Sequence, residues 1–122
     1  MPDKPANARA ALAQRAEALV AAHLEQHGFR VTGRNVRVGR LEIDIIARRH
    51  DLVVFCEVRG RSSDAFMAPA ASIDARKVER IRRAAATWLR GARLGPVDVR
   101  FDAAAVVFDQ LEPRIDYYEG AF

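Results

Sequence analysis

The chain has 122 residues, of which half are hydrophobic and 30% are charged, a composition typical of one globular domain with a single core. No run approaches the roughly 18 apolar residues that a bilayer span needs, and the first ten residues lack the apolar stretch of a signal peptide, so we expect a cytoplasmic protein without membrane association. Because Cys56 is the only cysteine, an internal disulfide and a thiolate zinc cluster are excluded.

The net charge of +4 is unevenly distributed along the chain. Residues 1–96 contain 18 Lys and Arg against 10 Asp and Glu, a net +8, whereas residues 97–122 contain two against six, a net −4. Clustered positive charge attracts polyanions, nucleic acid above all. The alternative is a coding bias of a GC-rich genome, because 18 of the 20 basic residues are arginine.

The N-terminal part is predicted to contain a short tail and a helix. Residues 1–8, with two prolines, are expected to form a flexible tail, which leaves residues 9–122 as a single domain. From about Arg9 to His27, apolar residues recur at helical spacing, and Gly28 is placed to end the helix.

Three strands are predicted to follow this helix. Residues 29–38 alternate weakly and are expected to form an irregular strand. The runs 41–48 and 52–61 are rich in β-branched and aromatic residues, so we expect a hairpin that turns tightly at His50 and Asp51.

A second helix and a further strand complete the predicted order. Residues 61–72 are expected to form a loop, and Ser72 or Asp74 is placed to cap a helix with a basic outer side. Residues 97–108 are predicted to form a strand, and residues 114–122 can add a short edge strand. The order α-β-β-β-α-β predicts an α/β fold in which helices flank a mixed sheet.

The hairpin brings carboxylates together. If Arg49 faces Leu52 across the turn, Asp44 lies directly opposite Glu57. Because successive side chains in a strand alternate faces, we expect one charged face and one core face. The charged face is expected to carry Glu42, Asp44, Glu57 and Arg59, and the core face Leu41, Ile43, Ile45, Leu52, Val54, Cys56 and Val58.

Opposed carboxylates in a hairpin have two physical explanations. Cβ atoms of directly opposed residues lie about 4.5–5.5 Å apart, so the two acids either repel each other or share a divalent cation. Hard oxygen ligands suit Mg²⁺ or Mn²⁺ better than zinc. The alternative is a solvated ion-pair ladder on an exposed face, in which Glu42 pairs with Arg59 or Arg61 and Asp44 pairs with a neighbouring arginine.

Five short motifs carry a family resemblance. "AEALVAAHLEQHGF", "EIDII", "VFCEVRGR", "DARK" and "RFD", in this order and spacing, resemble the YraN-like family of uncharacterised bacterial proteins, from about Gln14 to Phe122. That family is similar to the PD-(D/E)XK nuclease superfamily, which has the restriction-endonuclease-like fold of archaeal Holliday-junction resolvases. Ala16 and Leu41 depart from the pattern, because the family commonly has glycine at both positions.

The resemblance implies a set of site residues. Asp44 matches the aspartate that ends one strand, Glu57 the glutamate on the hairpin partner, and Arg59 the lysine position. These three are the implied catalytic residues. Glu17 matches a helix glutamate that joins Asp44 and Glu57 as a metal ligand, so the implied cofactor is Mg²⁺ or Mn²⁺.

Arg59 bears on whether the implied enzyme is active. A buried lysine can lose its proton and activate water, whereas arginine stays protonated and cannot act as a base. The resemblance implies a metal-dependent endonuclease acting on DNA phosphodiester bonds, with branched or damaged DNA as candidate substrates. Phosphate contacts are expected from Lys77, Arg80 and Arg61.

Two other kinds of function stay open. The first is a non-catalytic nucleic-acid-binding protein that keeps the nuclease fold, which Arg59 favours. The second is a protein-interaction module whose acidic tail docks on a basic partner. Resolvases of this fold work as dimers, so a homodimer is possible, although no motif in the sequence displays a dimer interface.

Overall fold

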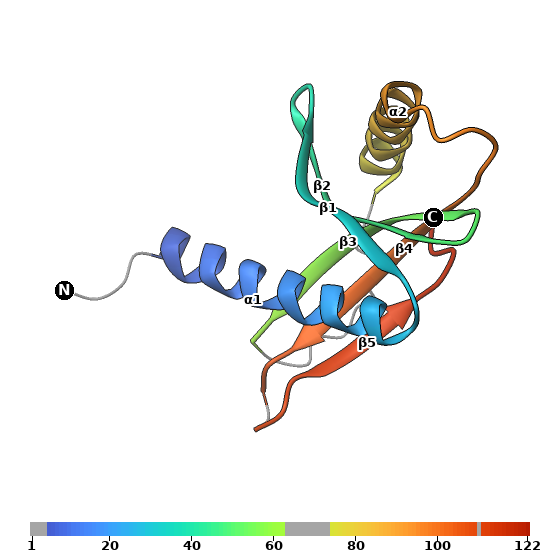
Figure 1. The fold of residues 1–122 in the computed structure, drawn as a ribbon. Coiled ribbons are helices and arrows are strands. Elements are labelled where there is room, and N and C mark those ends of the chain that lie inside the picture. Colours follow the sequence, from blue (N-terminus) through green and yellow to red (C-terminus); the bar gives the residue numbers. More distant parts are fainter. Residues whose placement is uncertain (1–4, 63–73, 110) are drawn as a thin grey trace.

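The computed structural model describes residues 5–62, 74–109 and 111–122, and its elements follow the predicted order (Figure 1). The turns after residues 38 and 49 each contain two residues, and the first residue of each, Gly39 and His50, has a positive φ. The short edge strand at the C-terminal end is present. The elements are α1 (Pro5–Gln26), β1 (Arg30–Val38), β2 (Leu41–Arg49), β3 (Leu52–Arg61), α2 (Ala75–Ala92), β4 (Asp98–Val107) and β5 (Arg114–Tyr118).

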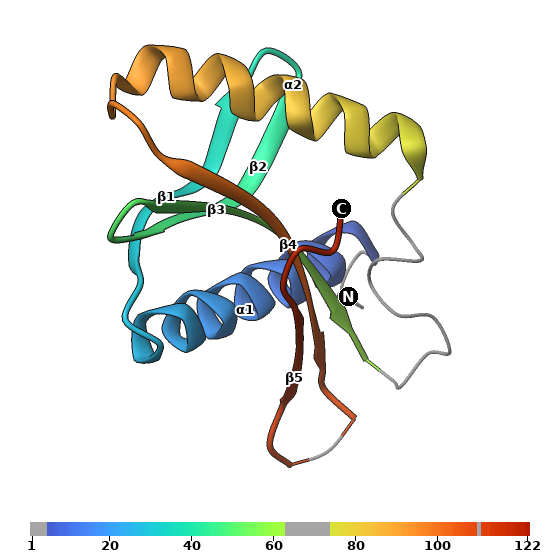
Figure 2. The same ribbon diagram turned by 90° about the vertical axis from the view of Figure 1, so that its right-hand side faces the viewer.

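The five strands form one mixed sheet in the order β1-β2-β3-β4-β5. β3 and β4 are parallel, with α2 as the crossover between them, and the other neighbouring pairs are antiparallel. The two helices cover opposite faces of the sheet (Figure 1 and Figure 2). The predicted α/β fold with a mixed, helix-flanked sheet is confirmed.

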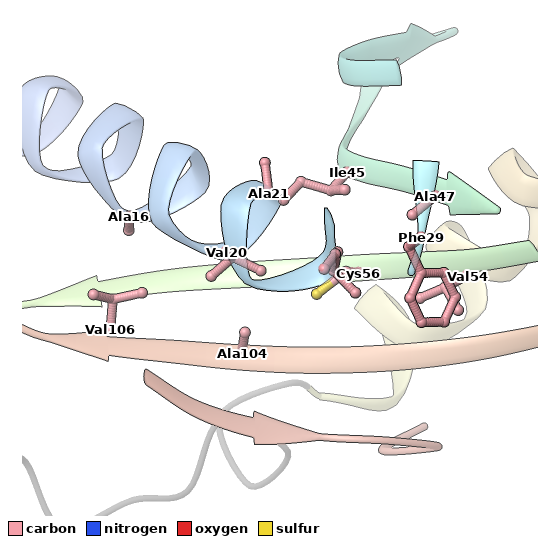
Figure 3. Close-up of a cluster of buried hydrophobic side chains, with 11 residues drawn as sticks. Ala16, Val20, Ala21, Phe29, Ile45, Ala47, Val54, Cys56, Ala104 and Val106 are labelled. Atoms are coloured by element: carbon pink, nitrogen blue, oxygen red, sulfur yellow. The ribbon is translucent and has the colours of Figure 1, made fainter. Parts of the chain in front are cut away.

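One core lies between α1 and the sheet. Val20 of α1 points toward the sheet, where Cys56 and Val106 are also buried (Figure 3), and Leu24 of α1 belongs to the same cluster. Gly60 of β3 permits a close approach of α1, because a Cβ at this position would lie 3.2 Å from the Ala16 Cβ. The close contact fixes the height of α1 over the strand that carries Glu57.

A second core lies between α2 and the other face of the sheet. Ile81 and Ala85 of α2 pack with Phe55, and the Trp88 ring meets the Phe55 ring edge-on at 5.8 Å between centroids. Asp74 caps α2 by accepting a hydrogen bond from the Lys77 backbone N–H at 2.8 Å. The cap and the apolar stripe together set the rotation of α2, and therefore the direction of its basic residues.

The predicted division of the hairpin into one core face and one charged face is confirmed only in part: Leu52, Val54 and Cys56 share the core under α1 as expected, but the opposite face is not an open charged face. Val53 and Phe55, on the face of Glu57, are buried under α2, because β3 is an interior strand covered on both sides. Ile43 also packs in the α2 core, whereas Ile45 packs under α1. Regular alternation is therefore interrupted at Asp44, where the β1–β2 hairpin continues beyond its pairing with β3 (Figure 1).

The first helix is longer than predicted. α1 begins at Pro5, so residues 5–8 are helical and do not belong to a flexible tail. Proline fits the first helical turn because its missing N–H has no helical partner there. The tail prediction for residues 1–4, and most of the loop predicted at 61–72, lie outside the described residues. In the part of the chain that is described, no helix is long and apolar enough to cross a membrane.

Candidate active site

The register of the β2–β3 hairpin places Asp44 beside Glu57. The paired residues run from Arg49 opposite Leu52 to Ile45 opposite Cys56, the register that the sequence predicts. One residue further along, the Asp44 Oδ2 accepts a hydrogen bond from the Val58 backbone N–H at 2.8 Å. This bond turns the Asp44 side chain toward β3 at the point where pairing of the two strands ends.

Glu57 is one of the few buried charged residues of the described chain, with 8% of its surface exposed. Its Oε1 lies 2.5 Å from the Nζ of Lys77, which is at the start of α2. Because α2 covers this face of the sheet, the ammonium reaches the carboxylate from above the strand. Lys77 is thus part of the carboxylate site and is not solely a surface residue.

Glu17 approaches the same site from α1. The side chain is 7% exposed, and its Oε1 is buried without a hydrogen-bond partner. An acceptor oxygen buried without a donor is unfavourable, so a ligand or water that bound it would be stabilising. The position of Glu17 therefore leaves one carboxylate oxygen available for a ligand.

The pKa values show that the carboxyl groups interact. Burial, the charge of Glu57 and, to a smaller extent, the charge of Glu17 together raise the pKa of Asp44 to about 8, although the Val58 hydrogen bond acts in the opposite direction. Burial also raises the pKa of Glu17, although an Asn35 hydrogen bond and the charge of Arg34 act in the opposite direction. The charges of Glu17 and Glu57 both act on Asp44, so the three carboxyl groups lie in one electrostatic site.

The predicted basic residues occupy three different places. Arg59 and Arg61 are half-buried on β3, and the Nε of each is buried without a hydrogen-bond partner. Lys77 is bound to Glu57, whereas Arg80, one helical turn later, is exposed. Arg80 is therefore accessible to a polyanion, and Arg59 lies on β3 two positions after Glu57.

The donor set fits a hard divalent cation, although the side chains do not form a coordination cage as they stand. Across residues 5–62, 74–109 and 111–122, no three Asp, Glu, His or Cys side chains are close enough to hold a metal ion together. The oxygen chemistry, the unpartnered Glu17 Oε1 and the crowding of Asp44 with Glu57 are nevertheless properties that Mg²⁺ or Mn²⁺ would satisfy. Side-chain rotations would be needed to bind a cation, including release of Glu57 by Lys77.

Two features of this site are absent from the sequence-based prediction. The first is the contact of Lys77 with Glu57, which depends on how α2 is rotated over the sheet; the cap at Asp74 is the signal that could have indicated it. The second is Asn35, whose side chain hydrogen-bonds Glu17 and lowers its pKa. Asn35 has a positive φ of 51° in the irregular part of β1, and asparagine is enriched in that conformation.

Comparison with known sequences identifies the family. Residues 16–106 match the Uncharacterised protein family UPF0102. The chain belongs to the UPF0102 family. UPF0102 proteins are the YraN-like proteins of the predicted resemblance, which is therefore confirmed.

Relatives within UPF0102 match along most of their length. A UPF0102 protein from Sorangium cellulosum is 46% identical over 121 residues, which cover 96% of this chain and 84% of the relative. One from Anaeromyxobacter dehalogenans is 40% identical over 114 residues, covering 93% and 85%. This UPF0102 chain therefore spans most of each relative.

The fold of this UPF0102 chain is shared with a solved structure. Hjc of Archaeoglobus fulgidus, a Holliday junction resolvase from an archaeal hyperthermophile, superposes with a TM-score of 0.52. The match covers 86% of this chain and 73% of Hjc at 18% sequence identity. At this identity the similarity establishes the restriction-endonuclease-like fold and leaves the activity to be argued from the site.

Proposed function

We propose that this protein is a metal-dependent endonuclease that hydrolyses DNA phosphodiester bonds, with branched or damaged DNA as its substrates. One observation carries the proposal: Asp44 and Glu57 meet at the end of the β2–β3 pairing, and Glu17 interacts with both. The resolvase-like fold supports it. Such an enzyme would act in the cytoplasm.

Glu17, Asp44 and Glu57 would hold one Mg²⁺ or Mn²⁺, with the Val58 carbonyl as a further oxygen donor. When bound, the cation would supply Lewis-acid chemistry and an activated water. The residues of the chain fix the orientation: the Val58 N–H holds one Asp44 oxygen, and α1 presents Glu17 from the other side. Release of the Asp44 proton is required before this carboxyl can act as an anionic ligand.

Arg59 and Lys77 would provide positive charge at the reacting phosphate. Arg59 remains protonated, so it is proposed to contact the scissile phosphate or orient the attacking water. Lys77 would turn from Glu57 toward a phosphate once a cation neutralises Glu57. Arg80 and Arg61 would bind backbone phosphates, which gives affinity without sequence specificity.

A specific observation favours a second function, non-catalytic nucleic-acid binding. The Lys77 ammonium lies 2.5 Å from Glu57 and neutralises this carboxylate without any metal ion. In addition, arginine occupies the lysine position at residue 59. In this alternative the ion pair is a permanent part of the structure, and the basic residues bind nucleic acid without cutting it.

Cleavage assays test the proposal. Single-stranded, duplex, flap and four-way-junction DNAs are incubated with the protein and Mg²⁺ or Mn²⁺, comparing the parent with Asp44→Asn. Asp51→Asn, at an exposed turn position, is the matched control. We expect cleavage by the parent and the control, strongest on branched DNA, and a loss of at least about a hundredfold in Asp44→Asn.

Cleavage that survives Asp44→Asn would rule out the proposed site. If no DNA is cut by the parent but binding weakens steeply with salt, the binding function is the correct one.

A further inference from the structure

A hollow of about 370 Å³ lies between the tip of the β1–β2 hairpin and the middle of α2. In both ribbon views the end of this hairpin is beside α2 (Figure 1 and Figure 2). The hollow has an apolar floor and a basic rim. The floor includes Val38, Leu41 and Ala84, and the rim includes Arg40, Arg80 and Arg83; this set is called the hairpin groove.

The rim of the hairpin groove has unneutralised positive charge. The side chains of Arg40 and Arg80 are exposed, and neither has an ion-pair or hydrogen-bond partner among the described residues. Arg83 pairs with Glu79 at 2.7 Å, but both side chains are mostly exposed, so this pair is weak. The groove therefore offers at least two guanidinium groups to an anion.

A second, smaller hollow continues the basic surface along α2. It has a volume of about 230 Å³ and is lined by Arg76, Glu79, Arg80 and Arg83. Arg80 and Arg83 line both hollows. Two adjacent depressions that share their cations suit an extended polyanion better than a single small anion.

The basic surface is aligned with the carboxylate site. Lys77, Arg80 and Ala84 fall on one side of α2, because residues three and four apart are neighbours on a helix. Lys77 contacts Glu57 at one end of this row, and Ala84 lies in the hairpin groove at the other. Seven residues of helix span about 10 Å, which corresponds to about three nucleotides along a duplex.

We propose that the hairpin groove binds the sugar-phosphate backbone of DNA about three nucleotides from the phosphate at Glu57. Arg40 and Arg80 hold backbone phosphates through the planar guanidinium geometry that suits phosphate oxygens, and Leu41 contacts the sugars. The direction of the bound DNA strand relative to the carboxylates rests on the proposed function, whereas binding of DNA in the hairpin groove does not require cleavage.

Salt-dependent binding tests the groove. The affinity for a labelled DNA duplex is measured in the presence of a chelator, from about 50 to 200 mM salt, for the parent, Arg40→Ala and Arg80→Ala. Arg9→Ala is the matched control, because Arg9 is an exposed arginine on α1. Each phosphate contact adds about 0.9 to the slope of log affinity against log salt. We expect Arg40→Ala and Arg80→Ala each to reduce the slope by about that amount, and Arg9→Ala to leave it unchanged.

The results separate this proposal from the nuclease proposal. Slopes for Arg40→Ala and Arg80→Ala equal to that of the parent would overturn the groove, even if the parent cuts DNA. Reduced slopes with no cleavage by the parent would support the groove and overturn the nuclease activity. Thermal unfolding of each variant confirms that the fold is intact, and Arg40 is suitable because it lies in an exposed turn.

Discussion

At the scale of single residues, burial and the charge of Glu57 keep the Asp44 carboxyl protonated at neutral pH. The pKa of Asp44 is about 8, far above the ordinary value of 3.8 for aspartic acid. Between these two values the folded protein holds a proton at Asp44 that the unfolded chain has released. The free energy of unfolding contributed by this residue therefore falls as pH rises from about 4 to about 8.

Asp44→Asn is expected to remove this contribution to the pH dependence, because asparagine does not titrate. Urea unfolding of the parent and Asp44→Asn at pH values between the two pKa values of Asp44 measures this pH dependence, with Asp51→Asn as the exposed control. The unfolding free energy of Asp44→Asn should decline less with pH than that of the parent or the control. Parallel curves for all three proteins would show that the Asp44 pKa is not raised in the folded state.

The residues of the site differ in how far the sequence could predict them. Strand alternation and a two-residue turn were sufficient to predict the β2–β3 register as far as Ile45 opposite Cys56, because register depends on local chain geometry. The strand pairing ends at Ile45, so the predicted position of Asp44 directly opposite Glu57 is not part of the ladder. Glu17 came from the family resemblance, because its distance from the hairpin depends on how α1 packs. The contact between Lys77 and Glu57 depends on the rotation of α2, which the Asp74 cap and the packing of its apolar stripe on the sheet set together.

At the scale of elements, the close contact of α1 with β3 positions Glu17. A Cβ at Gly60 would lie 3.2 Å from both the Ala16 Cβ and the Leu12 backbone oxygen. Because one of these neighbours is backbone, relief requires a shift of the helix and not only a side-chain rotation.

Gly60→Ala is therefore expected to lower the free energy of unfolding by about 1–3 kcal/mol. Gly91→Ala is the matched control: Gly91 lies in α2, and a Cβ there would have no atom within 4 Å. This control should gain about 0.5–1 kcal/mol, because alanine is the better helix former. Urea unfolding measures both, and equal effects of the two substitutions would contradict the close packing of α1 on β3.

The order of the elements followed from hydrophobic periodicity, but the faces of the hairpin did not. The run of apolar residues from Val53 to Cys56 is typical of a strand buried on both sides. Strict alternation instead predicts a strand with one side open to solvent. The change of face between Ile43 and Ile45 needs knowledge of where the β1–β2 hairpin diverges from β3. No local sequence rule gives that position.

At the scale of the whole molecule, the sheet order separates the opposite charges of the chain. β5, in the acidic C-terminal part of the chain, is at one edge of the sheet, whereas β1 and the hairpin groove are at the other edge. The sequence predicted attraction to a polyanion from the excess of arginine. It could not show that Arg40 and Arg80, 40 positions apart, line one groove, because the hairpin and α2 meet only in the folded protein.

We propose that three carboxylates from α1, β2 and β3 bind one metal ion, and titration calorimetry with Mg²⁺ or Mn²⁺ measures this binding. The titration is performed above the Asp44 pKa of about 8, where proton release no longer opposes binding, with the parent, Glu17→Gln and Glu25→Gln. Glu25 is an exposed glutamate on the same helix. We predict one site per chain, weakened at least about tenfold by Glu17→Gln and unchanged by Glu25→Gln. Equal affinities in all three proteins would show that Glu17 is not a metal ligand, and no binding by the parent would show that these carboxylates do not form a metal site.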